Sequence, residues 1–102
     1  MLSTIKLHRR ELDALCERVG ARRLDAFGSA VRSDFDPATS DLDFIVEFEP
    51  LAPAGYAEAY FTLKGELEAM FGCRVDLLTE RSLDNPFLRR RVDAERHRIY
   101  AR

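Results

Sequence analysis

The sequence predicts one small α/β domain in which helices flank a short β-sheet. Segments with helical periodicity alternate with short segments of strand periodicity, and 102 residues suffice for one hydrophobic core. The glycine-rich G-x-G-x-x-G turn of a strictly parallel dinucleotide-binding sheet is absent. Because the strands are few and short, each helix must lie against a face of the sheet. We expect the order α-β-α-β-α-β-α, with residues 1–102 forming a single domain.

The N-terminal part is predicted to form a helix followed by a strand. Apolar side chains recur at the i, i+3, i+4, i+7 spacing of one helical face. They are Leu12, Leu15, Cys16 and Val19. Gly20 follows where a helix commonly ends, because glycine adopts the left-handed conformation without strain. Residues 23–27 then predict a first strand, and Gly28 begins a turn that enters a short helix.

The middle of the chain has the clearest strand pattern. After a loop at residues 34–40, apolar and polar side chains largely alternate over residues 41–48, which indicates a strand with one buried face. The apolar residues of that face are Leu42, Phe44, Val46 and Phe48. Pro50 and Pro53 are expected to close this strand.

The C-terminal half is predicted to contain two helices and a third strand. The first helix carries apolar residues at helical spacing and is expected to end at Gly72. Those residues are Tyr56, Tyr60, Leu63, Leu67 and Met70. Residues 74–78 predict the third strand, and Asn85 and Pro86 have the residue types of a helix N-cap and first helical position. The last helix is expected to bury Leu88, Val92 and Ile99.

Composition narrows the class of protein. The 46% hydrophobic and 33% charged residues are typical of a folded globular chain, and a net charge of -2 gives no general attraction to nucleic acid or membranes. We therefore do not expect direct nucleic-acid binding. No apolar run approaches the roughly 18 residues of a membrane span, and no signal peptide is recognisable, so we expect a cytoplasmic protein. Cys16 and Cys73 are expected to be buried or half-buried thiols.

Three carboxylates indicate phosphate chemistry. Asp41 and Asp43 are two residues apart on a predicted strand, so both side chains project from one face, about 7 Å apart. Their like charges favour a divalent cation between them. Asp76 lies in a later apolar strand, where an unpaired carboxylate is costly to bury. If the two strands are neighbours, the three carboxylates can hold two Mg²⁺ ions suited to phosphoryl transfer.

A glycine-serine turn completes the pattern. Gly28 permits close approach of the backbone to a phosphate, and Ser29 adds a hydroxyl donor at the start of a helix. Arg32 could add charge to the phosphates or hold the loop at residues 34–36 in place. Each feature alone has an ordinary structural explanation, as a turn, a solvated strand end or an edge-strand carboxylate. Their order and spacing together favour a nucleotide site.

Other polar and aromatic residues are expected to be structural. Asp25, Asp34 and Asp36 are interpreted as surface or turn residues, and His8 and His97 as surface residues. A basic last helix is interpreted as a solvated face, with docking of a partner's acidic surface or contact with a nucleotide phosphate as the alternatives. Its basic residues are Arg89, Arg90, Arg91, Arg96, Arg98 and Arg102. The aromatic residues Tyr56, Tyr60 and Phe61 are expected in the core, although Tyr60 or Phe61 could face a partner.

The chain resembles the minimal nucleotidyltransferase family of the DNA polymerase beta superfamily. The family pattern is close to G-S-x-A-R-G, a short loop and S-D-x-D. Residues 28–33 read G-S-A-V-R-S and residues 40–43 read S-D-L-D. A later strand carries the third carboxylate at Asp76, within V-D-L-L. Val31 and Ser33 depart from the usual alanine and glycine.

The resemblance implies a nucleotidyltransferase fold with a mixed sheet. It implies Asp41, Asp43 and Asp76 as catalytic metal ligands, with Asp76 also activating the acceptor hydroxyl. The implied cofactor is Mg²⁺, as two ions, and ATP is the implied substrate. The candidate nucleotide-binding residues are Gly28, Ser29, Arg32 and Ser40.

The resemblance also implies a biological role. Stand-alone family members are similar to antitoxins that attach AMP to a tyrosine of a HEPN-domain ribonuclease toxin, so we expect such a toxin as partner. One alternative is an antitoxin that acts by contact alone. A second is a nucleotidyltransferase acting on a small molecule or RNA, against which the absence of an acceptor domain and the mild net charge both count.

Overall fold

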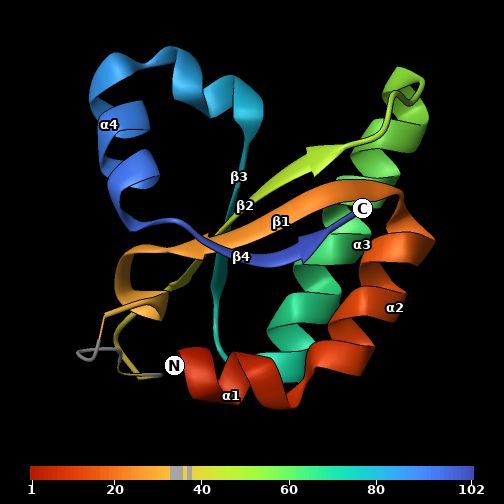
Figure 1. Ribbon diagram of the computed structural model, residues 1–102. Helices are drawn as coiled ribbons and strands as arrows, with labels where there is room; N and C mark the ends of the chain where they lie inside the picture. Colours follow the sequence, from red (N-terminus) through yellow and green to blue (C-terminus); the bar gives the residue numbers. More distant parts are fainter. Residues whose placement is uncertain (33–35, 37) are drawn as a thin grey trace.

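The fold is an open four-stranded mixed sheet with helices on both faces (Figure 1). The structure, a computed structural model, describes residues 1–32, 36 and 38–102. Within these residues the sheet order is β3-β2-β1-β4. The strands are β1 (Ala21–Phe27), β2 (Leu42–Phe48), β3 (Val75–Thr79) and β4 (His97–Ala101). β1 is antiparallel to both β2 and β4, whereas β2 and β3 are parallel, so the expected mixed α/β sheet is confirmed.

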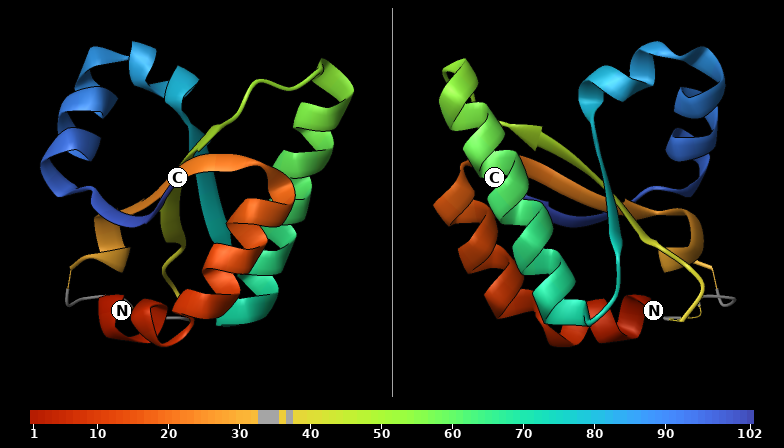
Figure 2. Two further views of the ribbon diagram at one scale, coloured as in Figure 1. Left: turned by 45° about the vertical axis from the view of Figure 1, so that its right-hand side comes forward. Right: turned by 180° about the vertical axis from the view of Figure 1, so that it is seen from behind.

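The helices cover the two faces unequally (Figure 2). They are α1 (Leu2–Leu7), α2 (Arg9–Val19), α3 (Pro53–Phe71) and α4 (Pro86–Glu95). α2 and α3 lie against one face, and α4 lies on the other side of the sheet. Two short 3-10 helices, Gly28–Ala30 and Glu80–Asp84, follow β1 and β3. Among the helices described, none is long and apolar enough to cross a membrane.

Side chains of β2 alternate between two separate hydrophobic clusters, one on each face of the sheet. Leu42, Phe44 and Val46 are buried in the main core together with apolar residues of α2 and α3. A smaller cluster on the opposite face contains Phe27, Ile45, Leu83 and Val92. Because side chains alternate along a strand, Asp43 lies on the same face as this smaller cluster. Asp43 of β2 and its register partner Asp76 of β3 therefore lie on the face of the smaller cluster, which fewer helices cover.

The predicted helix ends are confirmed. Gly20 ends α2 with φ 75°, and Gly72 ends α3 with φ 65°. The Asn85 side chain caps α4 by accepting hydrogen bonds from the backbone N–H groups of Phe87 and Leu88, at 3.0 and 3.3 Å. These caps satisfy backbone groups that have no partner within the helix.

The prediction for the C-terminus is wrong. The last helix ends at Glu95, and Ile99 lies in β4, which pairs antiparallel with β1. Arg96 takes an extended conformation, with φ -65° and ψ 137°, and turns the chain back to the sheet. The basic residues of this segment are accordingly divided between α4 and β4 instead of forming one solvated helix. The helix α1 was also not predicted.

The interpretation of Asp25 as a surface or turn residue is wrong. Its side chain is 0% exposed and accepts hydrogen bonds from Arg23 and Arg96, the latter with Nε at 2.6 Å. Arg96 also contacts Glu80 at 3.1 Å, so the network joins β1 to the end of α4. Asp36 is exposed in a turn, as expected, and Asp34 lies outside the described residues.

The remaining expectations are met in part. Cys16 is buried, which raises the pKa of its thiol to about 12, and Cys73 is half-buried. Tyr60 is half-buried and its hydroxyl donates to the Leu77 carbonyl at 2.6 Å, whereas Phe61 is 68% exposed and Tyr56 37%. His97 is exposed as expected, but His8 is half-buried, with its ring 5.3 Å from that of Phe71.

Candidate active site

The turn after β1 requires glycine for two separate reasons. Gly28 has φ 59°, in the left-handed region that side chains disfavour. A Cβ atom at this position would also collide with the Asp43 carboxylate. The sequence suggested that glycine admits a phosphate, but in the structure the space beside Gly28 is already used by Asp43. The turn and the candidate ligand therefore fit one another closely.

Ser29 links this turn to the start of β2. Its hydroxyl donates a hydrogen bond to the Asp41 carbonyl at 2.8 Å, and its backbone N–H lowers the pKa of the neighbouring Asp43 carboxyl. One residue thus fixes the relative positions of the turn and of both aspartates. Because the hydroxyl is engaged by the Asp41 carbonyl in this arrangement, the serine contributes to the shape of the site.

Asp43 and Asp76 face one another across two parallel strands. They are direct register partners between β2 and β3, and adjacent strands lie about 4.8 Å apart. Asp43 is half-buried and Asp76 is exposed. Burial raises the pKa of the Asp43 carboxyl, and the neighbouring negative charge of Asp76 raises it further. The Ser29 N–H and the positive charge of Arg91 lower it in part. The pair is electrostatically costly without a cation.

Asp41 forms an ion pair with Arg74. Its carboxylate contacts Nε of Arg74 at 3.1 Å, and the two side chains are 45% and 78% exposed. The structure therefore brings together two of the three predicted carboxylates. Over residues 1–32, 36 and 38–102, no group of three Asp, Glu, His or Cys side chains is arranged to hold a metal ion.

Arg32 follows the Gly28 turn and Ser40 precedes Asp41, and both form contacts with other residues of the chain. Arg32 contacts Glu95 of α4, with Nη1 2.6 Å from Oε2, and Arg91 lies 3.5 Å from the same carboxylate. The Ser40 backbone N–H donates to the Asp36 carbonyl at 2.7 Å within a turn. Ser33, the departure from the family pattern, lies outside the described residues.

Sequence reasoning placed Arg91 in a basic helix that could contact a nucleotide phosphate or a partner, but it missed Glu95. In the structure α4 lies on the face of the sheet that carries Asp43, and the positive charge of Arg91 lowers the pKa of the Asp43 carboxyl. Arg74 could have been suspected, since it lies two residues before Asp76. Its pairing with Asp41 nevertheless depends on the register of β2 and β3.

Comparison with known proteins identifies the family. The model of the nucleotidyltransferase domain matches residues 8–101. The chain belongs to the nucleotidyltransferase domain family. This nucleotidyltransferase is 37% identical over 81 residues to protein adenylyltransferase MntA of Thermococcus cleftensis, which covers 79% of this chain and 75% of that protein. The family predicted from the sequence is therefore confirmed, and the chain is a nucleotidyltransferase enzyme.

Solved structures agree with this fold. A protein provisionally described as a minimal nucleotidyltransferase is 38% identical with a TM-score of 0.75, covering 94% of this nucleotidyltransferase and 93% of that chain. A second match comes from a complex of a tri-AMPylated Shewanella oneidensis HEPN toxin with an MNT antitoxin. It is 19% identical with a TM-score of 0.62, and covers 96% of this chain and 73% of that one. At that identity the likeness concerns the fold alone.

Proposed function

We propose that this nucleotidyltransferase, acting as a single domain, transfers AMP from ATP to a tyrosine hydroxyl of a HEPN-domain toxin and thereby neutralises it. The similarity to protein adenylyltransferase MntA of T. cleftensis supports adenylyl transfer to a protein. The AMPylated HEPN toxin in the S. oneidensis complex supports the choice of partner. In this proposal the chain is an antitoxin that acts by covalent modification.

The observation that carries the proposal is the pairing of Asp43 with Asp76 beside the Gly28 turn. Burial, and then the like charge of Asp76 in direct register, raise the pKa of Asp43, an arrangement that weakens the fold. A binding site for a divalent cation and a triphosphate accounts for this cost. A purely structural role does not, because an uncharged side chain at either position would fit the strands better.

The donor set fits magnesium. Asp43 and Asp76 would hold the cation through carboxylate oxygens, which Mg²⁺ prefers. Asp41 would join them by leaving Arg74, and this exchange costs little because an exposed ion pair contributes little stability. When bound, such ions neutralise phosphate charge and acidify the acceptor hydroxyl.

The residues around the turn would hold the nucleotide. Gly28 and Ser29 lie at the end of β1 beside Asp43, where the triphosphate would be bound. Arg32 and Ser40 would add donors at the rim. Arg32 would approach the phosphates by moving from Glu95, which retains Arg91 as a neighbour.

The proposed reaction is an in-line displacement at the α-phosphorus of ATP. The tyrosine oxygen forms a new bond to that phosphorus, and the bond from phosphorus to the oxygen bridging to the β-phosphate breaks. Pyrophosphate leaves with the electron pair of that bond. Asp76 accepts the proton of the attacking hydroxyl. The products are O-adenylylated tyrosine and pyrophosphate.

The test combines the purified chain, α-labelled ATP, Mg²⁺ and a HEPN toxin encoded beside it. We expect label on a toxin tyrosine, with loss of at least about 100-fold in rate for Asp43→Asn, since a metal ligand acts on the transition state. Asp84→Asn serves as the matched control, because Asp84 is an exposed carboxylate at the end of a 3-10 helix away from the pair.

Removal of Mg²⁺ with a chelator should abolish labelling of the toxin. If the toxin binds and is neutralised but no nucleotide yields label, the chain is an antitoxin that acts by contact alone. If label appears on RNA or on a small molecule and not on the toxin, the partner in the proposal is wrong while the transferase chemistry stands.

A further inference from the structure

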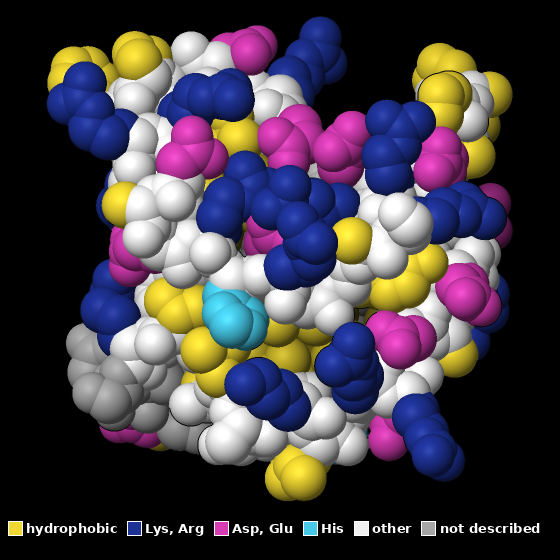
Figure 3. Space-filling view, in the orientation of Figure 1, with side chains coloured by type: hydrophobic (Ala, Val, Ile, Leu, Met, Phe, Trp, Pro, Cys, Tyr) yellow, Lys and Arg dark blue, Asp and Glu magenta, His cyan; other side chains and the backbone are white. Residues whose placement is uncertain are grey.

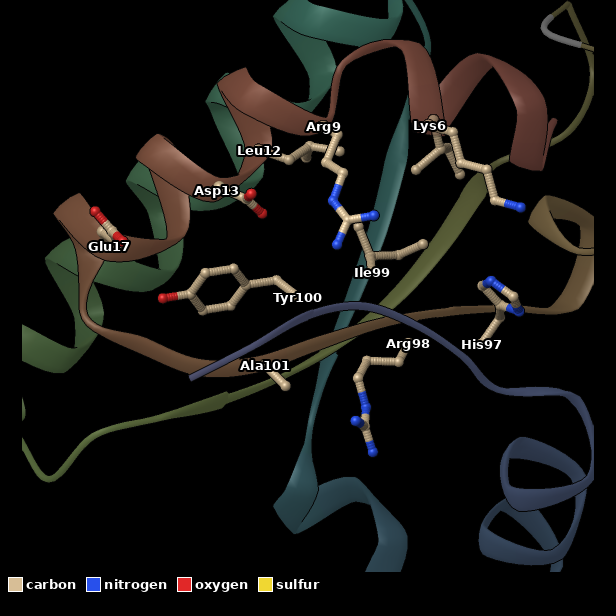
Figure 4. A pocket seen from close by; sticks show the side chains of 11 residues that line it. Lys6, Arg9, Leu12, Asp13, Glu17, His97, Arg98, Ile99, Tyr100 and Ala101 are labelled. Carbon is tan, nitrogen blue, oxygen red and sulfur yellow. The ribbon is translucent and has the colours of Figure 1, made fainter.

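The outer edge of β4, at the opposite edge of the sheet from β3, borders a pocket. β4 pairs with β1 on one side, and no strand in the described part of the chain pairs with its other side. The pocket has a volume of about 440 Å³ and lies between β4 and the helices α1 and α2 (Figure 4). Ile5, Leu12 and Ile99 form part of its lining. An unpaired edge strand beside a hollow is a surface to which another strand can add.

Four charged side chains follow one another along the helical wall of this pocket. They are Lys6 on α1 and Arg9, Asp13 and Glu17 on α2. The three residues of α2 are spaced by four, which keeps them on one face of that helix. In Figure 4, Lys6 lies toward the His97 end of β4, and Glu17 lies toward the Tyr100 end. In Figure 3, basic side chains below β4 are followed by acidic ones toward the right of the view. The wall is therefore basic at one end and acidic at the other.

The order of these charges is unfavourable for α2 itself. Arg9 lies at the positive N-terminal end of the helix dipole, and Glu17 lies near the negative C-terminal end. Elsewhere on α2, Glu11 and Arg18 follow the favourable order. An arginine placed four residues before an aspartate is also the weaker orientation for an ion pair within a helix.

None of the four charged side chains has an ion-pair partner among the described residues. The pattern is thus explained neither by the stability of α2 nor by contacts within the chain. Two basic residues followed by two acidic ones are complementary to the same pattern running in the opposite direction.

We infer that this face binds a second copy of the chain, with the two β4 strands antiparallel across a two-fold axis. Such an axis reverses the direction of the charge pattern in the second copy. Arg9 of each copy then faces Asp13 of the other, and Lys6 faces Glu17. Because a two-fold interface uses the same surface twice, each pair occurs twice. The two four-stranded sheets become one continuous sheet, which removes an exposed edge.

The candidate active site is left open in this arrangement. Asp43 and Asp76 lie on β2 and β3, which are separated from the β4 edge by β1. α2, which contacts both β1 and β4, lies on the opposite face of the sheet from the smaller core cluster. The inference does not depend on the proposed reaction, and activity gives an independent readout.

Sedimentation equilibrium of the purified full chain tests the inference. We expect a dimer that weakens as salt is raised, since salt screens exposed ion pairs. Arg9→Glu should raise the dimer dissociation constant by at least about tenfold, because each substitution removes two pairs and introduces two repulsions. Asp13→Arg should do the same. The combined variant Arg9→Glu with Asp13→Arg restores opposite charges across the axis and should restore the dimer.

Arg10→Glu is the matched control, since Arg10 is an exposed neighbour that does not line the pocket, and it should leave the dimer unchanged. A chain that is monomeric at about 100 µM overturns the inference, because a specific dimer of useful affinity would form there. So does a combined variant that dimerises no better than the single ones. If Arg9→Glu leaves the oligomeric state unchanged but weakens toxin binding, the occupant is the toxin and the inference is wrong.

Discussion

At position 28, backbone conformation and side-chain packing impose the same residue type. The φ of 59° alone disfavours any residue with a Cβ atom, and the Asp43 carboxylate fills the space that such an atom would need. The Ser29 hydroxyl then hydrogen-bonds to the Asp41 carbonyl just before β2, and its backbone N–H lowers the pKa of the Asp43 carboxyl. The precision of the candidate site therefore originates in two adjacent residues at the end of β1.

We predict that Gly28→Ala lowers the free energy of unfolding by about 2 kcal/mol or more, from backbone strain and displacement of Asp43. Nucleotidyl transfer should fall further than the loss of stability explains, because the displaced carboxylate is a candidate ligand. Chemical denaturation and labelling assays measure the two effects.

Gly65→Ala is the matched control for this prediction. A Cβ atom at Gly65 meets nothing within 4 Å, and the residue lies inside α3, so alanine should stabilise the protein by about 0.5–1 kcal/mol. Equal behaviour of the two alanine variants would contradict the structural explanation of Gly28.

At the scale of elements, the register between β2 and β3 creates the carboxylate pair. Asp43 lies opposite Asp76 because the two strands are parallel and aligned as observed. A shift of one residue would turn the Asp43 side chain toward the other face of the sheet. The pairing of two elements, and not either strand alone, therefore produces the charge that the site presents.

We predict that Asp43→Asn raises the melting temperature of the metal-free protein at neutral pH. Since the folded pKa of Asp43 is raised, the protonated form is favoured by folding, and this contribution is lost as pH rises through that pKa. Removal of the charge should therefore stabilise the fold above the ordinary pKa of 3.8, and the gain should shrink as pH falls.

Mg²⁺ should reverse this ranking in thermal melts. Binding to the native state stabilises it, so the ion should raise the melting temperature of the unmodified protein and leave Asp43→Asn nearly unchanged. A variant that is destabilised at every pH would show that the carboxylate pair has a structural role and would remove its connection to metal binding.

At the scale of the whole molecule, a buried ion pair between Asp25 and Arg96 joins the end of α4 to the sheet. Asp25 of β1 contacts Arg96 at the end of α4, and the smaller core cluster joins the same two regions. We predict that Asp25→Ala destabilises the protein by about 3 kcal/mol, because it leaves a largely buried arginine without its main counter-charge.

The control for Asp25→Ala is Glu66→Ala, which removes an exposed carboxylate lying 3.8 Å from Arg18. Its effect on the free energy of unfolding should stay within about 0.5 kcal/mol. Chemical denaturation followed by circular dichroism measures both. Comparable small losses in the two variants would mean that the Asp25 network contributes little to the cohesion of the fold.

The sequence predicts those parts of this molecule that depend on local patterns. β2, the glycine ends of α2 and α3, and the Asn85 cap follow from residue types at fixed spacings. The aspartates of the candidate site are recognisable for the same reason. In contrast, β4 has no alternating pattern, because a bulge interrupts its pairing with β1. Its apolar Ile99 was therefore assigned to a helix.

The unpredicted contacts all join distant segments. Asp25 with Arg96, Arg32 with Glu95 and Arg74 with Asp41 depend on how the chain returns to the sheet. Sequence periodicity does not reveal long-range ion pairs. A charged residue considered without its tertiary neighbours is expected to be exposed. Their discovery required the tertiary arrangement.

The collision between a side chain at position 28 and Asp43 bears on how inactive descendants of this protein would look. The left-handed φ of Gly28 favours glycine whether or not transfer takes place, so a copy released from selection for activity would still tend to retain it. Asp43 weakens the fold and would be free to change once its chemistry was no longer needed. Loss of Asp43 with Gly28 retained is thus the sequence change expected in a copy that no longer catalyses transfer.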